Sequence, residues 1–553
     1  MESSTSSPHR PDRTPSTVGR GGRCAVAVAE FSSMPTNPTP AAVRGDADRN
    51  RAAPGTGSAL AALAPDLRAA LTRVRYDAET LLEILGDDVH AALGRSEPVP
   101  VRRAALDAGE AGTLVRLFLL GDPLPERAVA AALAPVGLDR AYAAGLLDRD
   151  GDDVRAALDL RPLDLGDGPR WVLSDLDDGM RRRTLAPDHV LGVGQASLSL
   201  LRATPAAPVG SVLDLGVGCG VQAVHAAAYA RTVTGTDVNR RALWLADATA
   251  ALNGLDIELL EGSWFEPVAG RRFDQVVANP PFVVGPARVE HTYRDSGLAL
   301  DGASALVVSG APERLRPGGT AAMLASWAHV AGEDWRGRVS SWLPEHGIEA
   351  WIVQRDVADP ALYVGTWLRD AGLDPRDPQA QRRAERWLDA FAAAQVEGIG
   401  FGFVYLRAVD GPTEVLAEDL THGFDDPLGP EATAYFERAA WLRAVAADEN
   451  RAWTARFDVD PATALERVAL PGPDGWDERV LRLHRGDGPR WQHEIDDVAA
   501  ALLAGMRADG LPLEELVELL AIGHTGTTAT PEFRAAALAV TVGLVRHGLI
   551  RPA

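Results

Sequence analysis

Residues 212–220 read Val-Leu-Asp-Leu-Gly-Val-Gly-Cys-Gly, an apolar run that passes directly into a loop with glycine at every second position. Gly216, Gly218 and Gly220 can adopt backbone dihedral angles that other residues avoid, and they let a ligand approach the main chain closely. A helical pattern of apolar residues follows over 221–230. The stretch therefore predicts a strand, a ligand-binding turn and a helix, which is how a doubly wound α/β domain begins.

Two acidic residues accompany this loop. Asp214 precedes it in the pattern D-x-G-x-G-x-G, whereas the dinucleotide fingerprint G-x-G-x-x-G would need glycine in place of Val221. Asp237 ends the next predicted strand and is followed by Val238. A carboxylate at that strand end can accept hydrogen bonds from both hydroxyls of a ribose. The combination indicates a nucleoside-containing cofactor and makes a pyrophosphate seat less favourable, while Asp214 could serve a cationic ligand.

Strand and helix patterns alternate over residues 181–410. This alternation predicts an α/β fold, namely a doubly wound, Rossmann-like domain with seven strands. Residues 361–396 look helical and are expected to form an insertion. The predicted strands are residues 211–215, 232–236, 258–260, 275–278, 320–325, 349–353 and 400–407.

The tetrapeptide Asn279-Pro280-Pro281-Phe282 follows one of these strands. Two prolines cannot continue a strand, and they restrict the preceding residue to extended conformations. The Asn279 amide and the Pro280 carbonyl are therefore expected to stand fixed at a strand end, where ligands bind in open α/β sheets. Two neighbouring acceptors suit a planar NH2 group, and the Phe282 ring could stack on it.

Together these motifs resemble those of class I S-adenosylmethionine-dependent methyltransferases, over roughly residues 185–408. The Asn-Pro-Pro-aromatic signature is similar to that of enzymes that methylate planar nitrogens: HemK-type glutamine N5-methyltransferases of release factors, adenine N6-methyltransferases and ribosomal-RNA guanine N2-methyltransferases. The resemblance implies S-adenosylmethionine as cofactor and a catalytic set of Asn279, Pro280, Pro281 and Phe282. It implies cofactor contacts from Asp214, Gly216, Gly218, Gly220, Asp237, Val238, Ser263, Trp264 and Asn279.

Two positions depart from the HemK pattern. Ser263 stands where the family usually has an aspartate beside the cofactor adenine, so that contact could move to a backbone amide or to Trp264. Phe282 stands where HemK enzymes usually have tyrosine, and phenylalanine is more frequent in the guanine branch. His291, Tyr293 and Arg294 are candidates for a substrate-side loop, although an ordinary polar loop is the simpler interpretation. Residues 192–197 are a candidate cofactor-side contact or simply a turn and a helix start.

The flanking regions differ from the central one in pattern. Residues 1–57 are rich in Ser, Thr, Pro, Gly and Arg and are expected to be disordered; Met34 within them is an alternative start to Met1. Residues 58–180 predict helices followed by a hairpin over 154–163 and 170–174, which resembles a winged helix. Residues 411–553 predict a mixed α/β domain. The hexapeptide Gly-Asp-Gly-Pro-Arg-Trp at 166–171 recurs at 486–491, so this domain could also be winged-helix-like.

Composition narrows the functional classes. A net charge of −22 in 553 residues argues against broad, non-specific nucleic-acid binding. The absence of lysine excludes lysine nucleophiles and the P-loop. Cys24 and Cys219 allow neither a disulfide framework nor a cysteine-based metal site, and no metal is expected. No apolar run approaches the length of a membrane span, so we expect a cytoplasmic protein without membrane contact.

These inferences lead to one expected function and two alternatives. The expected function is N-methylation of a glutamine side chain in a protein, such as a translation factor. The alternatives are methylation of an exocyclic base amine in RNA or DNA, and an inactive scaffold that binds the cofactor and docks partners. The sequence leaves open the methyl acceptor, the oligomeric state and the role of the C-terminal domain.

Overall fold

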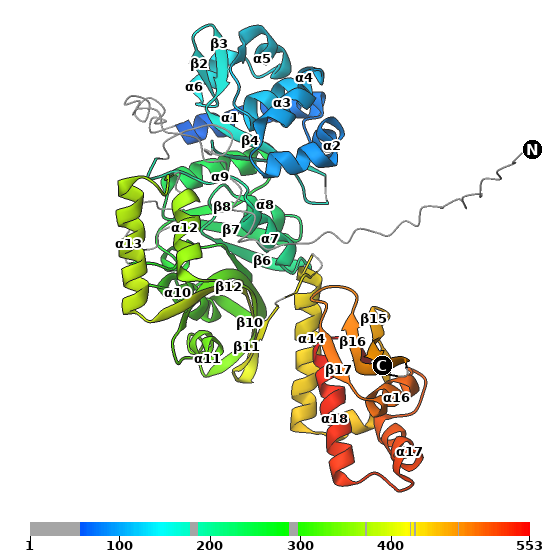
Figure 1. Ribbon diagram of the computed structural model, residues 1–553. Helices are drawn as coiled ribbons and strands as arrows, with labels where there is room; N and C mark the ends of the chain where they lie inside the picture. Colours follow the sequence, from blue (N-terminus) through cyan, green and yellow to red (C-terminus); the bar gives the residue numbers. More distant parts are fainter. Residues whose placement is uncertain are drawn as a thin grey trace, which may run out of the picture.

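The computed structural model describes residues 56–553, except for 167, 177–185, 282, 287–296, 371–372, 421, 425–426 and 474. The expected disordered tail thus lies almost entirely outside the described residues. An N-terminal helical region, a central sheet and a C-terminal region follow one another along the molecule (Figure 1). Among the described residues, no helix is both long enough and apolar enough to cross a membrane.

The central sheet has eight strands in the order β13-β11-β12-β10-β9-β6-β7-β8. Strand β12 runs antiparallel to β10 and β11, and all other neighbours are parallel. This order confirms the predicted doubly wound α/β fold. The strands are β6 (Val209–Leu215), β7 (Ala230–Asp237), β8 (Glu258–Glu261), β9 (Phe273–Ala278), β10 (Leu315–Val330), β11 (His346–Ala358), β12 (Val396–Pro412) and β13 (Glu414–Asp419).

The prediction of seven strands is one strand short. All seven expected segments form strands, and β13 adds an eighth beside β11. This edge strand has no buried residue, and its sequence Glu-Val-Leu-Ala-Glu-Asp begins and ends with acids. It therefore lacks the apolar run that marks the inner strands of a parallel sheet.

Helices cover both faces of the sheet because successive strand residues point to opposite sides. Val276 packs in one apolar cluster with Trp327, whereas its neighbour Val277 packs in another with Trp351 and Phe403. Helix α10 (Gly302–Gly310) contributes to the first cluster, and α8 (Val221–Ala226) and α9 (Arg240–Asn253) contribute to the second. The other helices of this domain are α7 (Gln195–Ala203), α11 (Trp335–Ser340), α12 (Pro360–Asp370) and α13 (Pro378–Ala393).

The N-terminal region contains the predicted hairpin, although the first strand of that hairpin is shorter than expected. Strands β1, β3 and β2 form one antiparallel sheet, and β4 and β5 form a separate pair joined across Gly166. The predicted pairing of 154–163 with 170–174 is confirmed from Leu158 onward, whereas residues 153–156 form the separate strand β3, which Ala157 divides from β4. The elements are α1 (Thr56–Val74), α2 (Ala78–Gly94), α3 (Pro98–Ala105), α4 (Gly109–Leu114), β1 (Leu124–Pro125), α5 (Glu126–Ala132), α6 (Leu138–Ala143), β2 (Leu147–Asp150), β3 (Asp153–Ala156), β4 (Leu158–Asp164) and β5 (Pro169–Asp175).

The N-terminal region is fastened to α9 of the central domain. The Trp171 N–H donates to Asn253 Oδ1 at 3.0 Å, and Asn253 Nδ2 donates back to the Trp171 carbonyl at 2.7 Å. From α1, Arg68 donates to the carbonyls of Ala251 and Leu252 near the end of α9. Helix α9 therefore links this region directly to the end of β7.

The C-terminal region mixes helices with short sheets. Strands β15, β16 and β17 form an antiparallel sheet, and β14 pairs with β18. The second copy of the repeated hexapeptide connects β16 to β17, as the first connects β4 to β5. The elements are α14 (Gly429–Ala447), α15 (Asn450–Thr454), β14 (Phe457–Val459), β15 (Thr463–Gly472), β16 (Gly475–Arg485), β17 (Gln492–Ile495), α16 (Asp497–Gly505), α17 (Leu513–Thr525), α18 (Pro531–Arg546) and β18 (Ile550–Pro552).

A buried ion-pair cluster joins α14 to the sheet and provides a test of this arrangement. The Glu349 side chain is 2% exposed and accepts hydrogen bonds from Arg407 on β12 and Arg443 on α14. Removing one member of a buried cluster leaves uncompensated charge, so Glu349→Ala should lower the free energy of unfolding by about 3–5 kcal/mol. Glu414 also contacts Arg443 but is 53% exposed, and Glu414→Ala should cost less than about 1 kcal/mol. Urea unfolding measures both, and equal losses would contradict the structure.

Candidate active site

The glycine loop leaves β6 at the centre of the sheet. The N–H groups of Gly216 and Val217 both donate to the Thr236 carbonyl, at 2.9 and 2.8 Å, so the loop is held against the end of β7. Gly216, Gly218 and Gly220 have φ values of 78°, 53° and 88°, which favour glycine. A Cβ added at Gly216 would meet no atom within 4 Å. The loop thus borders open space that a ligand could fill.

Asp237 ties this loop to the two adjoining segments. Its Oδ2 accepts from the Gly218 N–H at 3.0 Å, and its Oδ1 accepts from the Asn239 N–H at 2.8 Å at the start of α9. The Asp237 carbonyl accepts from the Gly262 N–H at 3.0 Å, just beyond β8. Burial raises the pKa of Asp237, although these backbone donors oppose the shift. The structure therefore brings together the loop and the acid that the sequence pairs.

Asp214 lies beneath the loop and is almost fully buried. Its side chain is 1% exposed, and within the described parts of the chain its Oδ2 has no hydrogen-bond partner. Burial raises the pKa of Asp214 to about 7, with a backbone hydrogen bond from Ala223 opposing the shift and nearby Asp237 adding to it. A buried carboxylate with a free oxygen is costly unless a donor or a cation reaches it. The buried Asp214 carboxylate therefore fits a ligand that carries positive charge.

Val238, Ser263 and Trp264 lie beside Asp237 at the same edge of the sheet. Val238 is 58% exposed, and Ser263 and Trp264 are half-buried. Trp264 has a φ of 49°, which is unusual for a bulky residue and marks a constrained turn after β8. All three residues thus adjoin Asp237 or the turn that its carbonyl holds.

Asn279 stands where β9 ends, between β6 and β10 in the sheet. Its Nδ2 donates to Ser197 Oγ on α7 at 3.3 Å, and the Ser197 carbonyl accepts from Gln222 Nε2 at 2.7 Å. Because Asn279 Nδ2 faces Ser197, Asn279 Oδ1 points away from Ser197 and can act as an acceptor. Pro280 is buried and Pro281 is half-buried. Phe282, His291, Tyr293 and Arg294 lie outside the described residues.

The insertion supports the segment that follows Asn279, a role that the sequence does not predict. The Val284 N–H donates to the Tyr363 hydroxyl of α12 at 2.7 Å. A Cβ on Gly285 would come within 3.1 Å of the Trp387 ring of α13, and the Gly285 carbonyl accepts from the Leu300 N–H at 2.8 Å. The aromatic residues of the insertion are the only sequence signal for this packing. Their spacing does not indicate that they contact residues some 80 or more positions earlier.

A second set of contacts that the sequence does not predict lies near the start of α9, beside Asp237. Asp175 Oδ2 accepts from the Val190 N–H at 2.9 Å and from Arg241 Nε at 2.8 Å. Asn239 Nδ2 donates to the Asp188 carbonyl at 2.9 Å. These contacts fix residues 188–190 against α9, directly before residues 192–197. The described residues contain no group of three or more His, Cys, Asp or Glu side chains placed to hold a metal ion.

Three family models match the chain. Residues 191–329 match the methyltransferase small domain. Residues 73–157 and 433–552 match two domains of unknown function, DUF7059 and DUF7782. With the strand order and the glycine loop, the first match defines the central region as a class I S-adenosylmethionine-dependent methyltransferase domain. It falls in the group that includes release factor glutamine methyltransferases and ribosomal RNA methyltransferases, and its cofactor is S-adenosylmethionine.

Curated relatives align with this central region. The release factor glutamine methyltransferase of Geobacter sulfurreducens is 38% identical over 121 residues, which are 20% of this chain and 43% of the relative. Its counterpart in Bordetella pertussis is 37% identical over 131 residues, which are 21% and 47%. The ribosomal RNA small subunit methyltransferase C of Alcanivorax borkumensis is 33% identical over 117 residues, which are 21% and 32%. The chain thus spans less than half the length of each of these relatives.

Solved structures resemble the chain only weakly. A 16S rRNA methyltransferase of T. thermophilus in complex with AdoMet and guanosine covers 45% of this chain and 65% of its own, with 19% identity and a TM-score of 0.26. An rRNA methylase of Streptococcus thermophilus covers 38% and 93%, with 12% identity and a TM-score of 0.21. At these scores the class of the domain rests on its own sheet order and on the family model.

Removing the charge of the buried Asp214 carboxylate should raise the stability of the protein but weaken its binding of the cofactor. A carboxyl whose pKa rises from about 4 to about 7 on folding stabilises the protein below about pH 4, and this contribution is lost as the pH rises to about 7. The neutral Asp214→Asn variant should therefore melt at a higher temperature than the parent at pH 8 without cofactor. It should also bind S-adenosylmethionine about tenfold more weakly, because a charged acceptor is lost.

Thermal unfolding with and without S-adenosylmethionine measures both effects. Asp274→Asn is the control, since hydrogen bonds from Ser211 and Arg316 outweigh burial and lower the pKa of Asp274. That variant should lose stability at pH 8 rather than gain it. An Asp214→Asn variant that melts below the parent at pH 8 would contradict this description of the site.

Proposed function

We propose that this protein is an S-adenosylmethionine-dependent N-methyltransferase whose acceptor is the side-chain amide of a glutamine in a protein of the translation machinery. The observation that carries the proposal is the position of Asn279. Its amide stands at the carboxyl edge of β9, next to the strand that leads into the glycine loop. Such an edge of an α/β sheet is where donor and acceptor can be held side by side.

The residues proposed to hold the cofactor are those of the loop and its surroundings. Asp237 would accept the ribose hydroxyls, Asp214 would face the positively charged part, and Ser263 with Trp264 would border the adenine. The glycine loop would allow the close approach that Gly216 permits. When bound, S-adenosylmethionine supplies an electrophilic methyl group on a sulfonium.

The residues proposed to hold the acceptor act on its two N–H groups. Asn279 Oδ1 and the Pro280 carbonyl would each accept one of them and so orient the nitrogen. An amide nitrogen is a poor nucleophile because its lone pair is delocalised. Two fixed acceptors favour the pyramidal form and stabilise the positive charge that develops on nitrogen, an effect typically worth about 3 kcal/mol for one aimed partner. Positioning adds a large further share. The carbon–sulfur bond of the sulfonium would break as the carbon–nitrogen bond forms, and no strong base is required because the nitrogen can release its proton to solvent after the transfer.

Phe282 is proposed to stack on the acceptor, and its identity favours a second candidate. Phenylalanine at this position is more frequent in the ribosomal-RNA guanine branch, and one matching relative is a ribosomal RNA methyltransferase. An exocyclic amine of a base would fit the same pair of acceptors. The net charge of −22 favours the protein acceptor, because RNA binding rests on neutralising phosphates. An inactive scaffold would not need Asn279 fixed in this place.

Asn279→Ala tests the proposal. We expect the turnover of a purified release factor with labelled S-adenosylmethionine to fall by a factor of about 100 or more, because an aimed acceptor is lost from the transition state. The affinity for the cofactor should stay within about twofold. Ser197→Ala, which removes only the support of Asn279, should reduce turnover far less. Wild-type turnover in Asn279→Ala would overturn the mechanism, and label in RNA with a steep salt dependence would favour the second candidate.

A further inference from the structure

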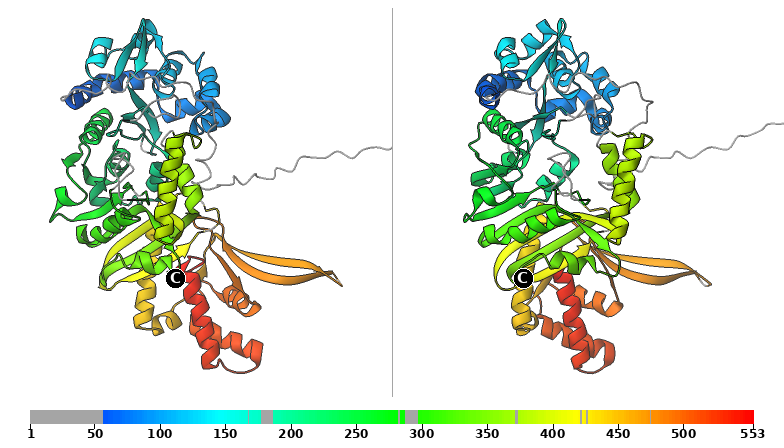
Figure 2. Two further views of the ribbon diagram at one scale, coloured as in Figure 1. Left: turned by 60° about the vertical axis from the view of Figure 1, so that its left-hand side comes forward. Right: turned by 90° about the vertical axis from the view of Figure 1, so that its left-hand side faces the viewer.

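The C-terminal region carries a long hairpin that projects from the body of the molecule. We call the two strands β15 (Thr463–Gly472) and β16 (Gly475–Arg485) together the arm (Figure 2). Strand β17 pairs only with Leu481–His484 at the base, so the outer part is a two-stranded ribbon. A ribbon of two strands buries little surface and is marginally stable by itself. Its length is therefore better explained by a contact that it makes with another molecule.

Large apolar side chains stand exposed along the arm. Trp476, close to the tip, is 75% exposed. Leu470 and Leu465 on the facing strand are 53% and 48% exposed. Trp476 has the highest exposed fraction among the large exposed hydrophobic residues that the structure describes. Trp476 pairs with Pro471, whereas Leu470 pairs with Asp477 and so lies on the opposite face of the ribbon. An exposed tryptophan is the kind of anchor that fills a pocket on a protein partner.

The charges of the arm do not suit a nucleic acid. Arg467 contacts Glu478 at 2.9 Å, and Arg479 contacts Asp477 at 3.0 Å. Arg482 contacts Glu466 at 3.4 Å. Each of these arginines is thus matched by an acid of the arm itself. Phosphate recognition needs positive charge without such partners, so the arm favours a protein surface.

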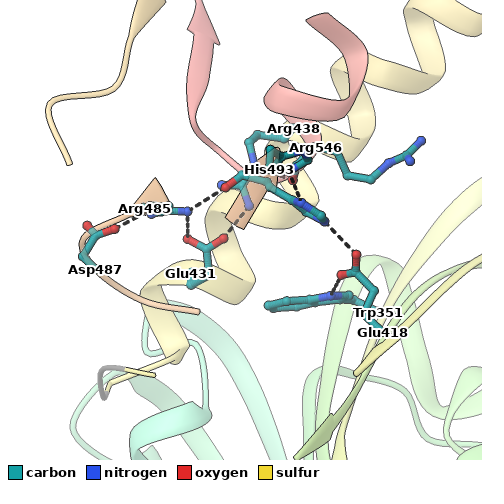
Figure 3. Close-up of polar contacts among 9 residues, drawn as sticks. Trp351, Glu418, Glu431, Arg438, Arg485, Asp487, His493 and Arg546 are labelled. Carbon is teal, nitrogen blue, oxygen red and sulfur yellow. Dashed lines mark hydrogen bonds and ion pairs between the residues drawn. The ribbon is translucent and has the colours of Figure 1, made fainter. Parts of the chain in front are cut away.

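The base of the arm is fastened by buried charges. Arg485 at the end of β16 contacts Glu431 of α14 at 2.8 Å and Asp487 at 2.7 Å (Figure 3). The Glu431 side chain is only 4% exposed and also pairs with Arg438. Breaking a buried pair of this kind is strongly unfavourable. The arm therefore keeps a fixed direction relative to α14.

A second group of contacts fastens this region to the central sheet. His547, after α18, lies 2.7 Å from Glu418 of β13 through Nε2 and 2.7 Å from His493 of β17 through Nδ1. Figure 3 labels Glu418 and His493. Trp351 of β11 donates to the other Glu418 oxygen at 3.0 Å. The arm is consequently placed at a fixed position with respect to the sheet that carries Asn279.

The arm points to the side of the molecule on which the acceptor is expected. Both views in Figure 2 show the arm and the α12–α13 pair projecting toward the same side. Helix α12 follows the carboxyl end of β11, and the strand pairing makes β11 parallel to β9. The α12–α13 pair therefore marks the edge of the sheet at which Asn279 lies. A protein held by the arm would face that edge.

We propose that the arm docks the protein that carries the methyl-accepting glutamine, with Trp476 as its principal anchor. This inference rests on the proposed function and specifies how the acceptor is recognised. A second copy of the chain is a poorer occupant, because a stable dimer needs about 20–30 residues a side, whereas an arm with three large exposed apolar side chains suits the smaller contact of a transient substrate complex.

Binding without turnover tests the proposal. Full-length chain with Asn279→Ala is titrated with a purified bacterial release factor, with and without Trp476→Ala. We expect Trp476→Ala to weaken binding at least about tenfold, as removal of a central aromatic anchor does. Leu519→Ala is the matched control, since Leu519 is 58% exposed on α17 of the same region and should change binding less than about twofold. Light scattering reports self-association, and methyl transfer by chains with native Asn279 is measured in parallel.

The outcomes distinguish a failure of the docking proposal from a failure of the proposed function. Loss of binding in Trp476→Ala supports the arm, even if the wild-type chain does not methylate the factor, in which case only the proposed function fails. If the factor is methylated and Trp476→Ala binds it as tightly as the parent does, the proposal that the arm docks the acceptor is wrong. The proposed function is then unaffected. Absence of any binding of the factor, Trp476-dependent dimerisation or Trp476-dependent binding of RNA would each overturn the arm as an acceptor dock.

Discussion

The carboxylate of Asp237 accepts one N–H from the glycine loop and one from the start of α9, and the rest of the site depends on these two hydrogen bonds. They tie the loop after β6 to the end of β7, and the main-chain carbonyl of Asp237 accepts from the Gly262 N–H in the turn after β8. Helix α9, which begins at this point, is also the helix to which β5 and α1 of the N-terminal region are fastened. One buried acid thus connects the proposed cofactor site to the packing of two regions.

The acceptor side of the site is organised by a different constraint, the stop that Pro280 and Pro281 impose on β9. The stop fixes where Asn279 stands, and Ser197 from α7 fixes how its amide is turned. The insertion then supports the segment after the prolines, because Tyr363 accepts a hydrogen bond from this segment and Trp387 packs against it. The proposed donor and acceptor sides therefore meet at one edge of the sheet, although they come from segments spread over about 200 residues.

The sequence predicts the parts of this arrangement that are local. An apolar run, a glycine loop and a strand-end acid each leave a pattern, and the seven predicted strands are confirmed. β13 was missed because an edge strand with acids at both ends has no apolar run. The β3–β4 boundary was missed because two consecutive strands of similar composition look like one. The contact of Tyr363 with Val284 and the salt bridge of Arg485 with Glu431 arise only when distant segments fold together, and no spacing rule contains them.

A chain without lysine uses arginine for every structural cation except histidine. Many of these arginines are paired with acids, in the interior around Glu349 and Glu431 and on the arm around Glu478 and Asp477. Because arginine forms planar, bidentate pairs, such networks fix the relative orientation of elements rather than attract phosphate.

Mass spectrometry of the methylated product tests the central claim most directly. A release factor is incubated with S-adenosylmethionine and the full-length chain, and the modified residue is located by fragmentation. The proposed mechanism predicts one added methyl group on the side-chain nitrogen of a glutamine. A methyl group on a carboxylate, hydroxyl or lysine nitrogen would contradict it, because none of these is a planar NH2 that Asn279 and Pro280 could hold.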